Sequence, residues 1–245
     1  MLRAMNERST SIPSLARMLL DEAWQLLLPQ RCIACGRFGA ALHDECVEAL
    51  PAADGVRCER CWEPGVRADV PRCDRCAKGG SDAPDFDALR TPFRFEGLAR
   101  RALLEAKFRG VTAYYPPLAR AAAAVVPPDW QPDAVVPVPL GRRRERTRGF
   151  NQAREAARTV AEALGVPLLD GLVRRSRETA PQAMLDAQRR RTNLGGAFVL
   201  VGTPPPRILI VDDVTTTGAT LSGVAAVLRE GGATHRFALA MARED

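Results

Sequence analysis

The feature that most constrains this chain is a series of paired metal-ligand residues in its N-terminal third. All seven cysteines of the 245 residues fall between positions 32 and 76, in pairs separated by two residues. A histidine fills the one position in this register where a further cysteine is missing. The eight residues are Cys32, Cys35, His43, Cys46, Cys58, Cys61, Cys73 and Cys76. Because two such pairs complete the tetrahedron of ligands that zinc prefers, the spacing predicts two zinc sites.

The ligands pair most simply in chain order, which gives one site of three thiolates and an imidazole and a second site of four thiolates. A nested pairing remains open at this stage. Disulfides are disfavoured because the cysteine count is odd and no secretory signal is predicted, and redox chemistry normally uses a single Cys-x-x-Cys pair. Few large apolar residues separate the pairs, so we expect metal to hold residues 31–80 together as a double zinc ribbon with a structural role.

Residues 1–30 include the apolar segment SLARMLLDEAWQLLLPQ. Its apolar residues recur at helical spacing, but Asp21 and Glu22 interrupt the run. A membrane span needs about 20 apolar residues, and a secretory signal would not carry two acids at this point. We therefore expect an amphipathic helix that packs on the protein, no membrane span, and a cytoplasmic location.

Residues 86–245 show apolar strands alternating with amphipathic helices. The continuous apolar runs VVPV and ILIV are typical of strands covered on both faces, so the pattern predicts an α/β domain with a parallel sheet flanked by helices. The expected strands are residues 88–95, 134–138, 207–211 and 237–241, and the expected helices are residues 98–108, 118–126, 152–164 and 219–230. In such sheets, ligands bind beyond the carboxyl ends of the strands.

The segment ILIVDDVTTTGAT, residues 208–220, places chemistry at such a strand end. Asp212 and Asp213 follow the expected buried strand and can accept hydrogen bonds from vicinal hydroxyls. A short loop then leads into the next helix, and its backbone amides at the positive end of that helix suit a phosphate. The loop residues are Thr215, Thr216, Thr217, Gly218, Ala219 and Thr220. Carboxylates for a diol beside amides for a phosphate match the two ends of a ribose 5-phosphate.

Other nucleotide-binding motifs do not fit the chain. The G-x-x-x-x-G-K-[ST] and G-x-G-x-x-G patterns are absent, and an acid pair so close to the C-terminus does not fit a receiver domain. The net charge of +6 is concentrated between Gly141 and Arg191, a segment that contains 13 arginines and 6 acidic residues. This segment would attract phosphates or an anionic partner, although a solvated helix face and loop would show the same composition.

VDDVTTTGAT resembles the signature with which type I phosphoribosyltransferases bind phosphoribosyl pyrophosphate (PRPP). Further motifs make the chain similar to the ComF family, phosphoribosyltransferase-like proteins associated with competence for natural transformation. These motifs are LLLPQRCIACG, the double zinc ribbon, EAKFRG, VVPVPL, RRRERTRGFNQA, TAPQ and NLGGAF. His43 stands where the family usually has a cysteine, and it preserves a zinc ligand.

The resemblance implies roles for individual residues. Asp212 and Asp213 would hold the ribose 2- and 3-hydroxyls as the catalytic pair, and residues 215–220 would hold the 5-phosphate. Val138 and Pro139 would approach the pyrophosphate, and Mg²⁺ would be held largely by oxygens of the ligand itself. Residues 176–196 would form a mobile loop that closes over the site. Positive charge near the pyrophosphate would come from Arg142, Arg143, Arg144, Arg146 and Arg148, and secondary candidates are Lys107, Arg109, Arg190 and Asn193.

Two functions remain open from the sequence. The first is a PRPP-binding transferase that acts on an acceptor the sequence does not name. The second is a non-enzymatic accessory factor of DNA uptake, in which the same fold binds single-stranded DNA and proteins of the competence machinery under ligand control. No residue in the sequence plainly activates a nucleophile or recognises a base, so the motif predicts what is bound better than what is done with it.

Overall fold

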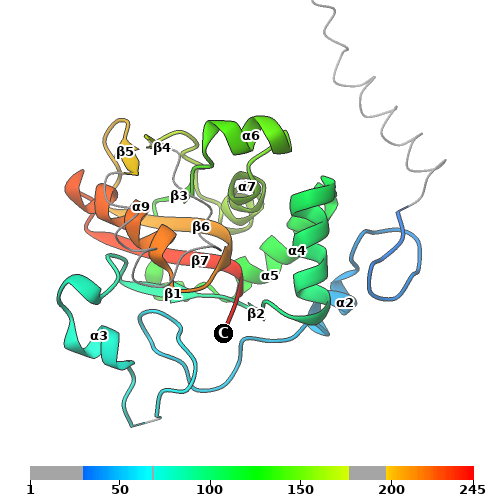
Figure 1. The fold of residues 1–245 in the computed structure, drawn as a ribbon, viewed down its shortest axis with the longest axis horizontal. Helices are drawn as coiled ribbons and strands as arrows, with labels where there is room; N and C mark the ends of the chain where they lie inside the picture. The colour runs from blue at the N-terminus through cyan, green and yellow to red at the C-terminus, as the bar shows by residue number, and fades with distance from the viewer. Residues whose placement is uncertain (1–29, 68, 177–196) are drawn as a thin grey trace, which may run out of the picture.

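The computed structural model describes residues 30–67, 69–176 and 197–245 (Figure 1). The helix expected within residues 1–30 and the loop expected at 176–196, with Arg190 and Asn193, lie outside the described residues except for their boundary residues 30 and 176. Within the described part, no helix combines the length and the apolarity needed to cross a membrane.

The main sheet is parallel, with the strand order β1-β7-β6-β3. Its strands are β1 (Ala88–Arg90), β3 (Ala134–Pro137), β6 (Arg207–Thr215) and β7 (His235–Arg243), and β2 (Phe93–Arg94) pairs with the end of β7. A separate antiparallel pair is formed by β4 (Val173–Arg175) and β5 (Phe198–Leu200). The parallel sheet and its flanking helices confirm the predicted α/β fold class, with the cysteine-rich segment before it.

The two faces of the sheet are covered by different helices (Figure 1). Leu209 and Val211 of β6 pack into a core with α4 (Gly97–Arg109), α5 (Tyr115–Ala124) and α7 (Gln152–Leu164). Ile208 and Ile210 point to the other face and pack with α9 (Ala219–Glu230). Because side chains alternate along a strand, the run ILIV fills both cores at once.

Short helices complete the described fold. They are α2 (Asp44–Glu48), α3 (Asp74–Lys78), α6 (Arg142–Arg148) and the 3-10 turns η1 (Gly80–Asp82), η2 (Thr112–Tyr114) and η3 (Pro128–Trp130). α2 and α3 each lie in one half of the cysteine-rich segment, and α6 carries the arginine run of residues 142–148.

Three predicted segments differ most from the structure. The strand expected at 88–95 is split into β1 and β2, because Pro92 between them has no N–H for the ladder; its carbonyl accepts from the Ala53 amide at 2.7 Å. The helix expected from Leu118 begins at Tyr115, since proline is tolerated in a first turn.

The third difference concerns the acid pair. The strand expected to end at Val211 continues to Thr215, because β7 extends alongside it and pairs with it up to Thr215↔Arg243. Asp212 and Asp213 therefore lie within the last residues of a strand, and the loop expected to hold a phosphate, called the phosphate loop below, shortens to residues 216–218. Strand pairing therefore fixes the backbone positions of both aspartates, which the sequence placed just beyond the end of the strand.

Candidate functional site

The acid pair is held by the backbone that follows it. The Asp213 amide donates to Asp212 Oδ1 at 2.8 Å, and the Val214 amide donates to Asp213 Oδ1 at 2.9 Å. Asp213 Oδ2 is buried, lies 3.7 Å from Lys107 Nζ, and accepts no hydrogen bond from any described residue. One carboxylate oxygen of Asp213 is thus oriented toward a hydrogen-bond donor that the described residues do not supply.

Burial and then the neighbouring charge of Asp213 raise the pKa of Asp212 well above its ordinary range, and Lys107 only partly opposes this. Tyr115 is fully buried behind the acids, and its hydroxyl has no hydrogen-bond partner among the described residues. Burial and then the charge of Asp213 also raise the pKa of Tyr115, so its phenol stays protonated. A ligand that donates hydroxyls to this site would relieve the repulsion between the carboxylates.

The loop between β6 and α9 requires a glycine. Gly218 is the N-cap of α9 with φ at +74°, a conformation that other residues adopt at a cost. A Cβ at this position would lie 3.1 Å from Phe86 Cζ, and Phe86 is fully buried. The chain therefore passes close over an aromatic ring and presents the first amides of α9, where the helix dipole favours an anion.

The acids and the loop line one cavity of about 410 Å³. All residues from 212 to 220 contribute to its wall. The opposite side comes from α4, through Lys107 and Phe108. The structure thus brings the acid pair and the loop of the motif together with Lys107, which was a secondary candidate. The motif residues are Asp212, Asp213, Thr215, Thr216, Thr217, Gly218, Ala219 and Thr220.

A second cavity of about 150 Å³ adjoins the first and shares Lys107, Asp212 and Asp213 with it. Its far side is built from Val138, Pro139, Arg144, Arg148 and Arg175. The shared acids lie between a loop suited to one phosphate and a cluster of arginines suited to another anion.

Asn151 and Gln152 also line this second cavity. The side-chain Nδ2 of Asn151 donates to the Val138 carbonyl at 3.1 Å. The side-chain Oδ1 of Asn151 accepts from the backbone amide of Ala153, which caps α7. Gln152 is buried, and its Nε2 has no hydrogen-bond partner among the described residues. The segment after β3 is therefore fastened to the start of α7, beside an amide donor that is still unpaired.

Some residues that the sequence predicted at the ligand site lie away from both cavities in the structure. Arg142 and Arg109 line neither cavity in the described part, and Arg109 lies 3.9 Å from Glu105. Reasoning from the sequence did not single out Tyr115 or Arg175. The RGFNQA motif contains Asn151 and Gln152, and the position of Asn151 just before an amphipathic helix was a usable signal for a cap.

The metal-ligand residues gather into the two clusters expected from chain-order pairing. Within each cluster, the candidate ligand atoms all lie within 4.8 Å of one another, and none of the seven cysteines forms a disulfide. The two clusters are Cys32, Cys35, His43 and Cys46, and Cys58, Cys61, Cys73 and Cys76. Four close thiol or imidazole groups fit a tetrahedral ion, so each cluster can hold zinc.

The first Cys-x-x-Cys pair of each cluster lies in a loop, called a knuckle here, that is closed by the same backbone hydrogen bond. In one, the Cys32 carbonyl accepts from the Gly36 amide at 2.9 Å, and in the other the Cys58 carbonyl accepts from the Trp62 amide at 2.9 Å. Burial alone would raise the pKa of the first thiol of each knuckle, but backbone hydrogen bonds outweigh it and lower the pKa of Cys32 to about 6 and that of Cys58 to about 7. At these two positions the backbone thus favours the thiolate form that binds metal. Burial instead raises the pKa of Cys46, Cys61 and Cys76 in the same clusters.

His43 is oriented for the same purpose. Its Nε2 lies 3.2 Å from the Phe38 carbonyl, and its Nδ1 lies 3.5 Å from Cys35 Sγ. If Nε2–H donates to the carbonyl, Nδ1 is left as the ligand atom, an arrangement typical of metal-binding histidines.

Comparisons with known proteins agree with the motifs. No protein-family model matches the chain. Competence protein F of Haemophilus influenzae is 40% identical over 105 residues, which are 41% of this chain and 46% of that protein. DNA utilization protein YhgH of Escherichia coli is 40% identical over 103 residues, and competence protein ComFC of Streptococcus pneumoniae is 39% identical over 99 residues. These matches cover 42% and 40% of this chain, and 45% and 42% of the respective relatives.

The chain thus covers less than half the length of the relatives it matches. Among solved structures, orotate phosphoribosyltransferase from Aeropyrum pernix matches 59% of this chain and 76% of its own, with 20% sequence identity and a TM-score of 0.32.

Proposed function

We propose that this chain is a member of the ComF family and that it binds PRPP or a related ribose phosphate, with Mg²⁺, in the two adjoining cavities around Asp212 and Asp213. One observation carries the proposal. Asp213 Oδ2 is buried beside Lys107 without a hydrogen bond from the described residues, at the point where the phosphate loop and the arginine cluster meet. Such an oxygen costs free energy unless a ligand donates to it.

Each part of the ligand finds matching groups. The ribose hydroxyls donate to the carboxylates of Asp212 and Asp213, and the 5-phosphate accepts from the amides of residues 216–218 at the start of α9. The pyrophosphate occupies the second cavity, where Arg144, Arg148 and Arg175 supply positive charge. Mg²⁺, when bound with the ligand, neutralises part of the pyrophosphate charge.

The same layout suits phosphoribosyl transfer as a proposed activity. The bond from the anomeric carbon to the pyrophosphate oxygen breaks, that oxygen keeps the electron pair, and the acceptor forms the new bond and gives up a proton. Positive charge then grows on the ribose ring, near the carboxylates, while the arginines stabilise the leaving pyrophosphate. A screen for pyrophosphate release across candidate acceptors tests this step, with the Asp212→Ala, Asp213→Ala double variant as the control.

Binding of ligand fragments tests the placement. Calorimetry with ribose 5-phosphate should show binding that Asp213→Ala removes and Arg148→Ala leaves nearly intact. Binding of pyrophosphate with Mg²⁺ should instead be lost in Arg148→Ala and nearly intact in Asp213→Ala. If both variants weaken both fragments equally, the ligand is not divided between the two cavities and the proposed placement is wrong.

A second function is favoured by the surface of α6. Arg142, Arg143 and Arg146 are exposed there, and relatives of this chain are named DNA utilization proteins. We propose that this face contacts phosphates of a single-stranded nucleic acid. Each phosphate contact should contribute about −0.7 to the slope of log affinity against log salt. Replacing the three arginines by glutamine should flatten this slope without changing PRPP binding, and an unchanged slope would refute the contact.

A further inference from the structure

The second metal cluster touches the back of the phosphate loop. Arg75 lies between two ligands of this cluster, Cys73 and Cys76. Its Nη1 donates to the Thr217 carbonyl at 3.1 Å, across 142 residues of sequence. Thr217 lines the 410 Å³ cavity on one side and a hollow next to the cluster on the other side, together with Arg75 itself.

The direction of that hydrogen bond matters for the loop. In a trans peptide, the C=O bond of one residue and the N–H bond of the next lie in one plane and point in opposite directions, and no described peptide bond is cis. When Arg75 holds the Thr217 carbonyl toward the metal cluster, the Gly218 amide points away from the cluster. Gly218 lines the ligand cavity, so this orientation presents an N–H donor where the proposed phosphate would lie.

The other end of Arg75 faces the cluster. Arg75 Nη2 is buried and has no hydrogen-bond partner among the described residues. The Arg75 guanidinium lies beside the sulfur of Cys61, which belongs to this cluster. A metal-bound Cys61 thiolate would accept from Nη2, and this supplies a partner for the unpaired donor.

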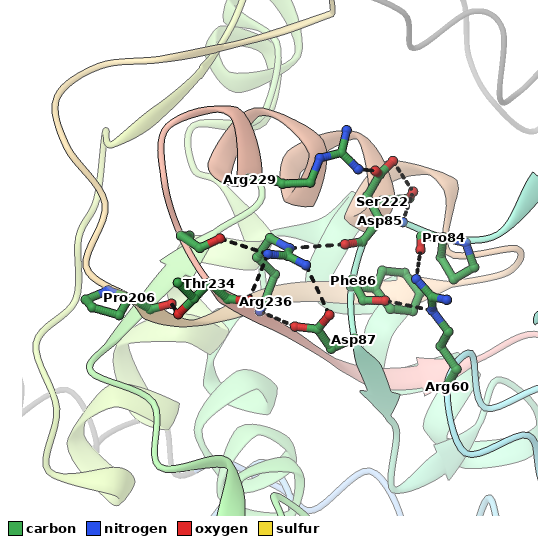
Figure 2. A network of polar contacts seen from close by, with 11 residues as sticks. Arg60, Pro84, Asp85, Phe86, Asp87, Pro206, Ser222, Arg229, Thr234 and Arg236 are labelled. Carbon is green, nitrogen blue, oxygen red and sulfur yellow. Dashed lines mark hydrogen bonds and ion pairs between the residues drawn. The ribbon is translucent and has the colours of Figure 1, made fainter. Parts of the chain in front are cut away.

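A second arginine of the same cluster binds the backbone on either side of Asp85, next to the aromatic ring that the loop packs against. Arg60, between Cys58 and Cys61, donates from Nε to the Phe86 carbonyl at 3.1 Å and from Nη2 to the Pro84 carbonyl at 2.6 Å (Figure 2). The Phe86 ring is the surface on which Gly218 rests, with contacts near 3.1 Å for an added Cβ. The second cluster therefore reaches the loop both directly and through Phe86.

The first cluster is arranged differently. Its Arg37 donates to the Cys35 sulfur at 3.4 Å and pairs with Glu45 on the surface. Cys32 and Cys46 pack into the core on the α4 and α5 face, whereas Cys58, Cys61 and Cys76 pack into the core on the α9 face, with Phe86. Arg37 thus offers a matched comparison for Arg75, an arginine beside a ligand sulfur that belongs to the other core.

We propose that Arg75 is a positioning residue, which links the second metal cluster to the phosphate loop by holding the Thr217 carbonyl and so aiming the Gly218 amide into the ligand cavity. This inference rests on the proposed function for the identity of the ligand. The orientation of the loop itself does not depend on that identity. Metal binding at the second cluster, and not at the first, then sets the geometry of the phosphate site.

The test compares Arg75→Met, Arg75→Lys and Arg37→Met with the wild-type chain. Methionine keeps a long apolar stem but loses both donors, and lysine keeps the charge but cannot donate in two fixed directions. Zinc content is measured first, and two ions per chain should remain. Hydrogen exchange of the Gly218 amide, followed without ligand, should become faster in Arg75→Met, intermediate in Arg75→Lys and unchanged in Arg37→Met.

Affinity for PRPP with Mg²⁺ should fall about tenfold in Arg75→Met, the loss expected for one hydrogen bond from a charged group. Unchanged exchange and affinity in a zinc-replete Arg75→Met protein would overturn the proposal. If that variant loses its second zinc, Arg75→Lys decides, and wild-type exchange in a zinc-replete Arg75→Lys protein would overturn it. Failure of the wild-type chain to bind PRPP would instead refute the proposed function, while ligand-free exchange would still test the link.

Discussion

Replacing Gly218 by alanine should strain the phosphate loop in two separable ways. At φ +74° an alanine pays about 1–2 kcal/mol for the left-handed conformation. Its Cβ would also lie 3.1 and 3.2 Å from two atoms of the Phe86 ring, which is fully buried. Overpacking of this kind costs about 1–3 kcal/mol, and relief by movement of the loop would displace the amides that face the cavity.

Gly165 provides the matched control, because its φ is +68° and an added Cβ there meets no atom within 4 Å. Both variants should lose thermal stability, at about 2–4 °C per kcal/mol for a chain of this size. Gly218→Ala should lose several degrees more than Gly165→Ala, measured by scanning calorimetry, and should bind PRPP more weakly. Equal shifts of Tm and equal affinity in the two variants would refute the close approach of the loop to Phe86.

Two further changes have defined outcomes. The raised pKa of Asp212 means that the folded protein binds this proton more tightly than the unfolded chain, so stability falls as the pH rises from about 4 through the raised pKa. Asp212→Asn should therefore raise the Tm of the ligand-free protein at pH 7, and the gain should vanish near pH 4; a gain that persists there contradicts this reasoning. His43→Cys should retain two zinc ions per chain by metal analysis, whereas Cys73→Ser should retain one, because only the latter removes a ligand type that zinc prefers.

Local patterns predicted those parts of the fold that depend on neighbouring residues. The ILIV run and the spacing of the cysteine pairs led to a covered parallel strand and to two clusters, and the structure confirms both. The predicted end of β6 was wrong, because two adjacent aspartates lower the local strand propensity while pairing with β7 extends the strand to Thr215. The β4 and β5 pair was not predicted, since its register depends on segments far apart in the chain.

The candidate site shows the same division. Asp212, Asp213 and the loop lie within one short segment, so their spacing alone indicated an acid pair beside an anion site. Tyr115 and Arg75 could not be found in this way. Their places at the site arise from packing between distant elements, as in the hydrogen bond from Arg75 to Thr217, and no pattern in the sequence records which arginine reaches the loop.

Binding of PRPP to the aspartate pair tests the central claim most directly. Calorimetry in Mg²⁺ should show one PRPP per chain, and Asp212→Ala with Asp213→Ala should weaken binding by at least about tenfold, since ligand hydroxyls would be left unpaired. Asp170→Ala is the control, because this exposed acid pairs with Arg154 and lines neither cavity. Wild-type affinity in the double variant, or no binding by the wild-type chain, would contradict the account.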